Sequence, residues 1–205
     1  MHASVHARGP ARLPGNVASW AVRPLIPHGN PTDLPVQRLE ASLRLEAGAP
    51  GEGMRLTAQF RVTGDTARIA IPPRAAGHRI DGLWRHTCFE FFVRGRAMRA
   101  YAEVNLAPSR DWAAYAFAGY REGQRPIAGI DAPAIDVAVS PQHLDLVATL
   151  PLAALLPTDC ATIHAVLAAV IEERDGRLTY WALAHPDPQR ADFHHTEGFV
   201  HEIRH

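Results

Sequence analysis

The chain has 205 residues, of which 47% are apolar, and this combination is typical of one domain with a single hydrophobic core. Its 21 basic and 21 acidic residues cancel to a formal net charge of zero, which argues against nucleic acid as a partner and against a polybasic membrane anchor. Every basic residue is an arginine, and the lack of lysine excludes P-loop nucleotide binding and Schiff-base catalysis.

The sequence also indicates where the protein is located and whether its cysteines form disulfides. No apolar run reaches the roughly 18 residues that a membrane-spanning helix needs. The first 16 residues lack the apolar core of a signal peptide. Cys88 and Cys160 are too few for a disulfide scaffold, although one bridge between them stays open. We therefore expect a soluble, cytoplasmic protein with no membrane partner.

The N-terminal segment differs in composition from the rest of the chain. Residues 1–35 contain six prolines and no sustained hydrophobic periodicity. This composition predicts an arm that lies loosely along the body, with residues 20–25 as its anchored stretch. From residue 36 onward apolar and polar side chains alternate, so we expect a single domain over residues 36–205.

Alternation with a period of two predicts short strands along most of the domain. A helical turn is expected at residues 151–156. The strands are expected at residues 39–45, 54–62, 67–71, 83–93, 99–107, 113–120, 135–139, 143–150, 162–173, 178–185 and 198–203. About ten short strands with turn residues between them, and no long amphipathic helix, predict an all-β fold, an antiparallel β-sandwich of the jelly-roll type.

Two consecutive predicted strands each have one apolar face and one polar face. In residues 83–93, Phe89 and Phe91 alternate with polar side chains, and in residues 99–107 Val104 does the same. If these strands are antiparallel neighbours, their polar faces form one patch that contains Trp84, His86, Glu90, Tyr101, Glu103 and Asn105. An aromatic platform beside carboxylate, amide and imidazole groups suits a small polar ligand such as a sugar. The alternative is an ordinary solvated outer face.

A predicted hairpin extends this patch. Asp175 and Gly176 are the favoured pair for a two-residue turn, which would place Trp181 opposite Val170 and His185 opposite Val166. Trp181 and His185 would then join the patch. The alternative is that Trp181 lies in the core.

Two histidine-rich segments raise the question of a metal. Residues 185–197 contain six His, Asp or Glu side chains, but their spacing matches no zinc pattern, so we expect a loop held by side-chain hydrogen bonds. Residues 201–205 read HEIRH and fit H-E-x-x-H, yet that motif needs a helix, whereas the flanking residues predict a strand. We therefore predict no metal site and no cofactor, with a metal in the first segment as the alternative.

Four segments, taken in order, resemble the DOMON-like domains, which are relatives of the family 9 carbohydrate-binding modules. The resemblance spans residues 36–203. The segments are LWRHTCFEFF at 83–92, YAEVNLAPSRDW at 101–112, YAFAGYR at 115–121, and YWALAHP at 180–186 with DFHH at 192–195.

The resemblance implies a β-sandwich and one of two kinds of ligand. Sugar-binding members hold a glycan end between aromatic rings with polar neighbours, and cytochrome-type members hold haem through Met and His. Motif positions that match the sugar-binding pattern are Trp84, Glu90, Glu103, Asn105 and Trp181. Neither Met54 nor Met98 falls in a recognisable haem motif.

The leading hypothesis is a non-catalytic module that binds a carbohydrate or a similar small polar ligand on the patch. One alternative is a haem- or metal-binding protein that uses histidines. A second is a glycosidase-like enzyme with Glu90 and Glu103 as paired carboxylates. A third is a face that binds another protein or a second copy of the chain.

Overall fold

The computed structural model describes residues 22–157 and 160–204. Residues 1–21 of the predicted arm, which include the first two residues of its anchored stretch, and His205 of the HEIRH motif lie outside these ranges. Twelve strands are assigned within them: β1 (Arg23–Pro27), β2 (Val36–Ala47), β3 (Met54–Gly64), β4 (Cys88–Gly95), β5 (Tyr101–Leu106), β6 (Trp112–Phe117), β7 (Arg125–Pro126), β8 (Ala134–Val139), β9 (His143–Pro151), β10 (Thr162–Glu172), β11 (Leu178–Ala182) and β12 (His201–Arg204).

The helical content of the described ranges is limited to four short 3₁₀ turns. They are η1 (Thr66–Arg68), η2 (Leu83–Arg85), η3 (Leu152–Ala154) and η4 (Thr196–Gly198). The prediction of an all-β antiparallel sandwich with short helical turns is confirmed, and its jelly-roll type stays a prediction. The turn expected at residues 151–156 corresponds to η3.

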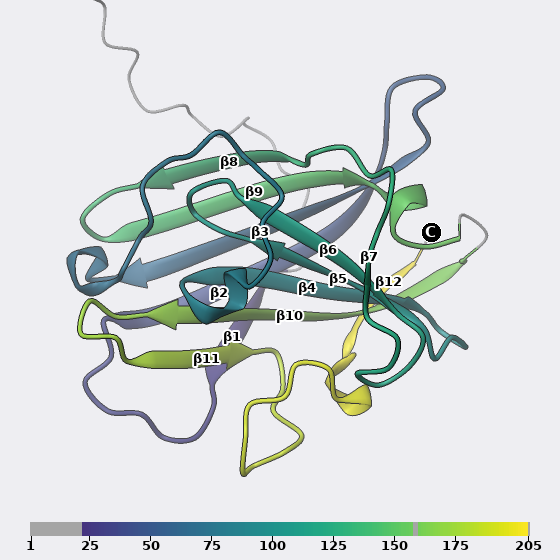
Figure 1. Cartoon of the computed structure of the whole chain (residues 1–205). Coiled ribbons are helices and arrows are strands. Elements are labelled where there is room, and N and C mark those ends of the chain that lie inside the picture. The colour runs from purple at the N-terminus through teal and green to yellow at the C-terminus, as the bar shows by residue number, and fades with distance from the viewer. Residues whose placement is uncertain (1–21, 158–159, 205) are drawn as a thin grey trace, which may run out of the picture.

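The strands form one continuous curled sheet whose two halves face each other (Figure 1). Its order is β7-β6-β5-β4-β10-β11-β1-β2-β3-β9-β8, and β12 pairs with β10 off this path. All strand pairs are antiparallel. We call β1, β2, β3, β8 and β9 the first half, and the remaining strands the second half.

Strand β1 joins the two halves. Leu25 pairs with Leu39 of β2, and Ile26 pairs with Ala182 of β11. This strand lies inside residues 1–35, where we expected a loose arm anchored at residues 20–25. The buried Leu25 side chain and the backbone pairing extend the anchored stretch to Pro27.

The main core lies between the two halves. Phe60 of β3 contacts Phe89 of β4, with ring centroids 5.1 Å apart, and both side chains are fully buried. The apolar faces predicted for the second half point into this core, which contains Phe89, Phe91, Val104 and Leu106. A smaller apolar cluster, with Phe92, Tyr101, Phe117 and Phe199, covers part of the opposite face of the second half.

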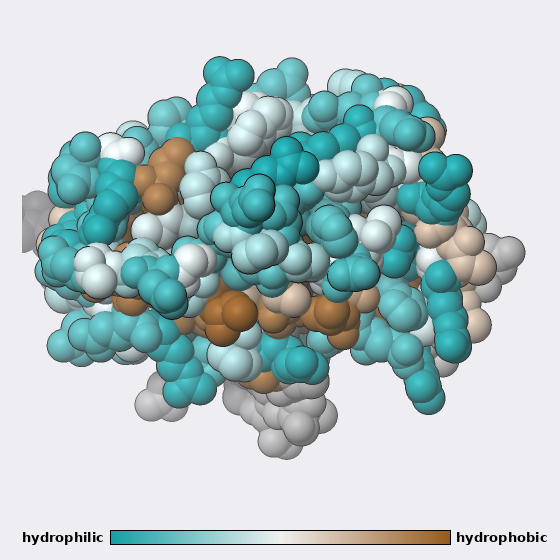
Figure 2. Space-filling view, turned by 90° about the horizontal axis from the view of Figure 1, so that it is seen from below, coloured by the Kyte–Doolittle hydropathy of each residue, from teal (hydrophilic) through white to brown (hydrophobic). Residues whose placement is uncertain are grey.

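The face of the molecule that Figure 2 shows is mostly hydrophilic. Seen from below, it carries a narrow band of hydrophobic side chains across its middle (Figure 2). Exposed large apolar residues include Ile26 of β1 and Val200 just before β12. The two internal clusters therefore hold most of the large apolar side chains of the described ranges.

Several predicted strands are wrong or too long: those at 113–120 and 178–185 end early, at Phe117 and Ala182, the one at 198–203 begins only at His201, and two others differ most. The strand expected at residues 67–71 is the turn η1, because the Asp65 carboxylate caps it by accepting the Ala67 amide hydrogen at 3.1 Å. The strand expected at residues 83–93 begins only at Cys88. Gly82 has a left-handed φ of 82° and leads the chain into η2, so Trp84 and His86 do not lie on the strand.

The hairpin between β10 and β11 has a different register from the predicted one. Glu173 donates its amide hydrogen to the Arg177 carbonyl, and Glu172 pairs with Leu178. The loop therefore contains three residues, 174–176, with Gly176 at a φ of 88°. This shift by one residue places Trp181 opposite Ala169 and points its side chain into the core.

Candidate functional site

A cavity of about 370 Å³ lies on the outer face of the second half. This volume is at the small end of the range for ligand pockets. Three of the predicted site residues line it: Trp84 from η2, Glu90 from β4 and Glu103 from β5. Further lining residues, which the sequence analysis did not select, are Phe117, Arg121, Gln124, Tyr180, Phe193 and His194.

Glu90 and Glu103 form the acidic floor of this cavity. Both are buried, with 3% and 4% of their surface exposed. Glu90 pairs with Asn105 on the neighbouring strand, so Glu103, two residues earlier, is its diagonal neighbour on the same face. The predicted strand parity thus brings the two carboxyl groups together as expected.

The two carboxyl groups differ in their hydrogen bonds. Oε1 of Glu103 accepts a hydrogen bond from Nδ2 of Asn105 at 2.7 Å. Oε1 of Glu90 is buried without a hydrogen-bond partner among the residues that the structure describes. A buried carboxyl group without a partner is costly, because it loses its water shell and gains nothing in exchange.

Burial and mutual repulsion change how these groups titrate. Burial raises the pKa of Glu90 well above its usual 4.5, and the negative charge of Glu103 raises this pKa further. Burial also raises the pKa of Glu103 to about 7, against the opposing effects of the Asn105 hydrogen bond and of Arg121. At pH 7 about half of the Glu103 carboxyl groups are therefore protonated, and burial favours the protonated form of Glu90 as well.

A chain of hydrogen bonds fixes His194 beside this floor. The Arg121 amide donates to the Tyr101 hydroxyl at 3.2 Å, and that hydroxyl lies 2.8 Å from Nδ1 of His194. If the hydroxyl donates to Nδ1, then Nε2 carries the ring hydrogen, and it lies 3.8 Å from Oε2 of Glu103. Burial lowers the pKa of His194 to about 4, so the ring is neutral at pH 7.

Arg121 closes the cavity by joining two loops. Its guanidinium donates to Oδ1 of Asp192 at 2.8 Å, while the Tyr120 hydroxyl donates to Oδ2 at 2.5 Å. Asp192 is buried, and burial opposes its charge, but the hydrogen bonds from Tyr120 and Arg121 keep its pKa below the usual value. The charge of Arg121 is therefore already shared with Asp192.

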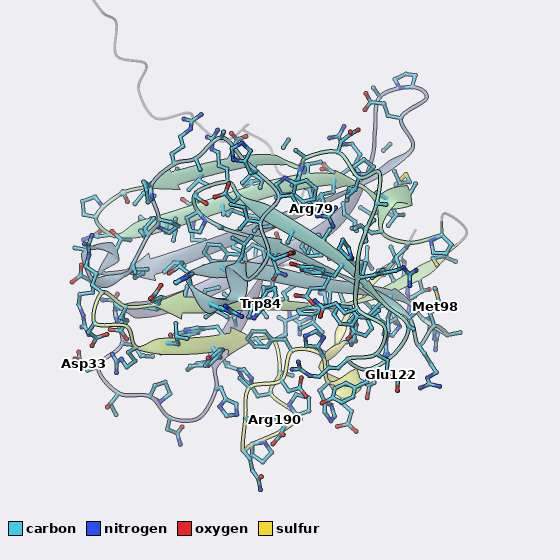
Figure 3. All side chains as sticks on the ribbon, in the orientation of Figure 1. Asp33, Arg79, Trp84, Met98, Glu122 and Arg190 are labelled. Atoms are coloured by element: carbon cyan, nitrogen blue, oxygen red, sulfur yellow. The ribbon has the colours of Figure 1, made fainter. Side chains whose placement is uncertain are left out.

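Aromatic rings form the rim of the cavity. Trp84 and Tyr180 are 37% and 36% exposed, which is high for such large side chains. Trp84 contacts Tyr115 edge to face with centroids 6.0 Å apart, and Tyr180 lies 6.3 Å from Phe193. Figure 3 shows Trp84 in front of the sheet and Arg190 at the tip of the loop that follows β11. These rings offer flat apolar surfaces beside the acidic floor.

Tyr101 and Asn105 lie directly behind the lining residues. Tyr101 is stacked on Phe117, with centroids 4.7 Å apart, and its burial raises its pKa to about 12. Asn105 is fully buried and contacts Glu103 and Cys88. Both residues position cavity groups without lining the cavity themselves.

The other three predicted residues lie away from the cavity. Nδ1 of His86 is 2.8 Å from Oε2 of Glu172. Nε2 of His185 donates to the Ile26 carbonyl at 2.9 Å, which attaches the loop after β11 to β1. Trp181 is in the core, where its indole donates to Oγ1 of Thr179 at 3.0 Å. The misplacement of His86 follows from the start of β4, that of His185 from the end of β11, and that of Trp181 from the register of the hairpin.

The residues missed by the sequence analysis come mainly from loops. Arg121, Phe193 and His194 reach the cavity through contacts between segments 71 to 93 residues apart in sequence. Two signals were available: the cluster of His and acidic side chains at 185–197, which suggested a structural loop, and the resemblance segments at 115–121 and 192–195, which contain all three residues. Tyr180 was adjacent to the selected Trp181, and the register shift decides between them.

Side chains of residues 185–197 stabilise their own loop. Asp187 accepts from the Gln189 amide, and His195 caps η4 by accepting from the Glu197 amide. No group of three potential metal ligands occurs within residues 22–157 and 160–204. His201 lies on β12, and its Nε2 donates to the Leu43 carbonyl, so the predicted strand at HEIRH is confirmed for the described part of the motif.

The residues present do not fit a haem held by Met and His. His194 lines the cavity, whereas Met54 packs against the main core. Met98 lies beside Cys160 at the far end of the sheet from Trp84 (Figure 3).

No helix in the described ranges is both long and apolar enough to cross a membrane.

Comparison with known proteins gives a likeness in fold. No family model and no curated protein matches the sequence. A solved protein from Bacteroides uniformis, to which carbohydrate binding is ascribed, is similar with a TM-score of 0.60 and 15% identity, over 90% of this chain and 86% of its own. A family 9 carbohydrate-binding module from Caldicellulosiruptor kristjanssonii, in complex with cellotriose, is similar with a TM-score of 0.50 and 13% identity, over 96% and 89%. The DOMON-like assignment rests on the sequence resemblance alone.

Proposed function

We propose that this chain is a non-catalytic carbohydrate-binding module that holds a small sugar in the cavity over β4 and β5. One observation carries the proposal: two buried carboxyl groups, Glu90 and Glu103, face a cavity whose rim has the exposed rings of Trp84 and Tyr180. A sugar ring has an apolar face that stacks on such rings and hydroxyl groups that bond to carboxyl oxygens.

The hydrogen-bonding groups of the floor match those of a sugar. A hydroxyl group donates one hydrogen bond and accepts others, and a carboxyl pair that shares a proton also does both. The unpartnered Oε1 of Glu90 needs a donor. Two similar structures concern carbohydrate-binding proteins, which supports a sugar as the ligand class.

An enzyme with Glu90 and Glu103 as paired carboxylates is the second candidate. Diagonal neighbours on adjacent strands have backbones roughly 7–8 Å apart, which is compatible with the carboxyl separations of about 5–9.5 Å found in glycosidases. Both groups, however, rise from one floor, whereas glycosidase carboxyls flank the scissile bond. Binding without hydrolysis is therefore the better-supported function.

Two tryptophan variants test the proposal with the same substitution. We expect Trp84→Ala to weaken binding of glucose or cellotriose by about tenfold or more, because a stacked ring contributes on the order of 1–3 kcal/mol. The free energy of unfolding should fall less in Trp84→Ala than in Trp181→Ala, because emptying the core site of Trp181 costs about 3–5 kcal/mol. Isothermal titration calorimetry and urea unfolding measure the two effects.

Three outcomes would contradict the proposal. If no sugar in a panel of neutral and charged mono- and oligosaccharides binds the wild-type chain, the cavity is not a sugar site. If the chain releases reducing ends from an oligosaccharide, and Glu90→Gln and Glu103→Gln both abolish this release, the chain is an enzyme. If light scattering shows a dimer that Trp84→Ala dissociates, the rim is a protein interface.

A further inference from the structure

The charges around the cavity do not balance. Glu90, Glu103 and Asp192 are acidic, while Arg121 and the mostly exposed Arg190 are basic. Arg121 and Arg190 both pair with Asp192, at 2.8 and 3.6 Å. His194 supplies no positive charge, because burial lowers its pKa to about 4. The floor therefore has two carboxyl groups without a cation of their own.

Every other group that faces the floor is neutral. Cys88 lies behind it as a thiol, because burial raises its pKa well above the usual value. Tyr101 remains protonated, with its pKa raised to about 12 by burial, and Asn105 carries no charge. The β10 and β11 side chains on the cavity are Val170 and Tyr180.

Glu90 is the independent sign that a ligand group belongs here. Its side chain lines the cavity, only 3% of the residue is exposed, and its Oε1 lacks a partner in the described ranges. Asn105 already donates a hydrogen bond to one oxygen of Glu103, so Glu90 is the carboxyl group that lacks a donor. A charged donor compensates a buried carboxylate better than a neutral hydroxyl does.

We propose that the cavity selects sugars that carry a free, protonated amine, with the ammonium group bound between Glu90 and Glu103 under the rings of Trp84 and Tyr180. This inference rests on the proposed function and specifies its ligand class. An ammonium group has three hydrogens to donate, enough for both carboxyl groups and one further acceptor. The electron-rich faces of the rim rings also attract a cation.

Binding of an amine carries a proton signature that binding of a neutral sugar lacks. In the free protein about half of the Glu103 carboxyl groups carry a proton at pH 7, since burial raises their pKa to about 7, and burial favours the protonated form of Glu90 as well. An ammonium group favours the ionised carboxylates, so its binding expels that proton to the solvent. Calorimetry in two buffers of different ionisation enthalpy measures this release.

The experiment compares D-glucosamine, D-glucose and N-acetyl-D-glucosamine at about pH 7, just below the pKa of an ordinary amine of this type. The acetylated sugar keeps the substituent but removes its charge. We expect glucosamine to bind about tenfold more tightly than either neutral sugar and to release protons. Glu90→Gln should abolish this preference, while Glu202→Gln, which removes an exposed carboxylate on β12, should retain it.

The outcomes separate this inference from the proposed function. Glucose binding equal to or tighter than glucosamine binding overturns the amine preference and leaves the sugar module intact. Lack of binding by all three sugars overturns both. Binding by glucosamine alone supports the inference and restricts the proposed function to charged sugars. A preference that survives in both Glu90→Gln and Glu103→Gln overturns the assignment of the ammonium to this floor.

Discussion

At the scale of single residues, Glu103 is a side chain whose burial disfavours its ionised form. The folded chain raises its pKa from 4.5 to about 7, chiefly through burial, so folding favours the protonated form. Below pH 4.5 both the folded and the unfolded chain hold this proton, and Glu103 causes no loss of stability. As the pH rises towards 7, only the unfolded chain loses the proton, and the free energy of unfolding falls.

Glu103→Gln removes this pH dependence. Relative to the wild type, the variant should gain up to about 3 kcal/mol in unfolding free energy between pH 4.5 and 7, because folding raises the pKa of Glu103 from 4.5 to about 7. The comparison must be made with the variant because His194 acts with the opposite sign: its lowered pKa adds stability as pH rises from about 4 to 6.5. Urea unfolding at several pH values measures the difference, and a pH-independent difference would refute the argument.

At the scale of elements, the turn between β10 and β11 determines whether Trp181 or Tyr180 points into the core. Gly176 has a φ of 88°, and no atom lies within 4 Å of where a Cβ would be. Gly176→Ala therefore meets only backbone strain, and we expect it to reduce stability by about 1–2 kcal/mol. Asp175→Ala, at the neighbouring loop position, is the control. A Gly176→Ala variant as stable as the wild type would show that the loop relaxes into another register.

Alternation along β4 and β5 was enough to predict the acidic floor. Glu90 and Glu103 share a face because every second residue of these strands enters the core, and the cost of moving Phe91 or Val104 out of the core enforces this parity. The alternation of side chains does not show at which residue a strand begins. Gly82 and η2 move Trp84 off β4, and a three-residue loop instead of a two-residue loop turns Trp181 inward.

Sequence periodicity could not predict the loop residues of the cavity, for a different reason. Arg121, Phe193 and His194 have no periodic pattern, and their positions depend on the buried Asp192 that the two loops share. Such an ion pair forms only after the sheet has brought both loops to the same edge. The sequence therefore predicted the carboxyl groups on β4 and β5 and missed the cavity residues on the loops.

At the scale of the whole molecule, the cavity depends on a strand that lies outside the predicted domain. β1 pairs with β2 on one side and β11 on the other, so it joins the two halves of the sheet. The Ile26 carbonyl also accepts the hydrogen bond from His185, at the start of the loop that carries Phe193 and His194. Loss of β1 would open the sandwich and release one wall of the cavity.

Two N-terminal deletions test this role. Deletion of residues 1–27 removes β1 and the buried Leu25, whose burial alone contributes roughly 1.5–3 kcal/mol. For a chain of this size, such a loss lowers the melting temperature by about 5 °C or more. Deletion of residues 1–16, which the sequence predicts to be dispensable, should change it by less than about 2 °C. The shorter deletion should also retain sugar affinity, whereas the longer one should weaken it even at temperatures where the chain stays folded. Equal melting temperatures for the two deletions would mean that β2 and β11 hold the halves together without β1.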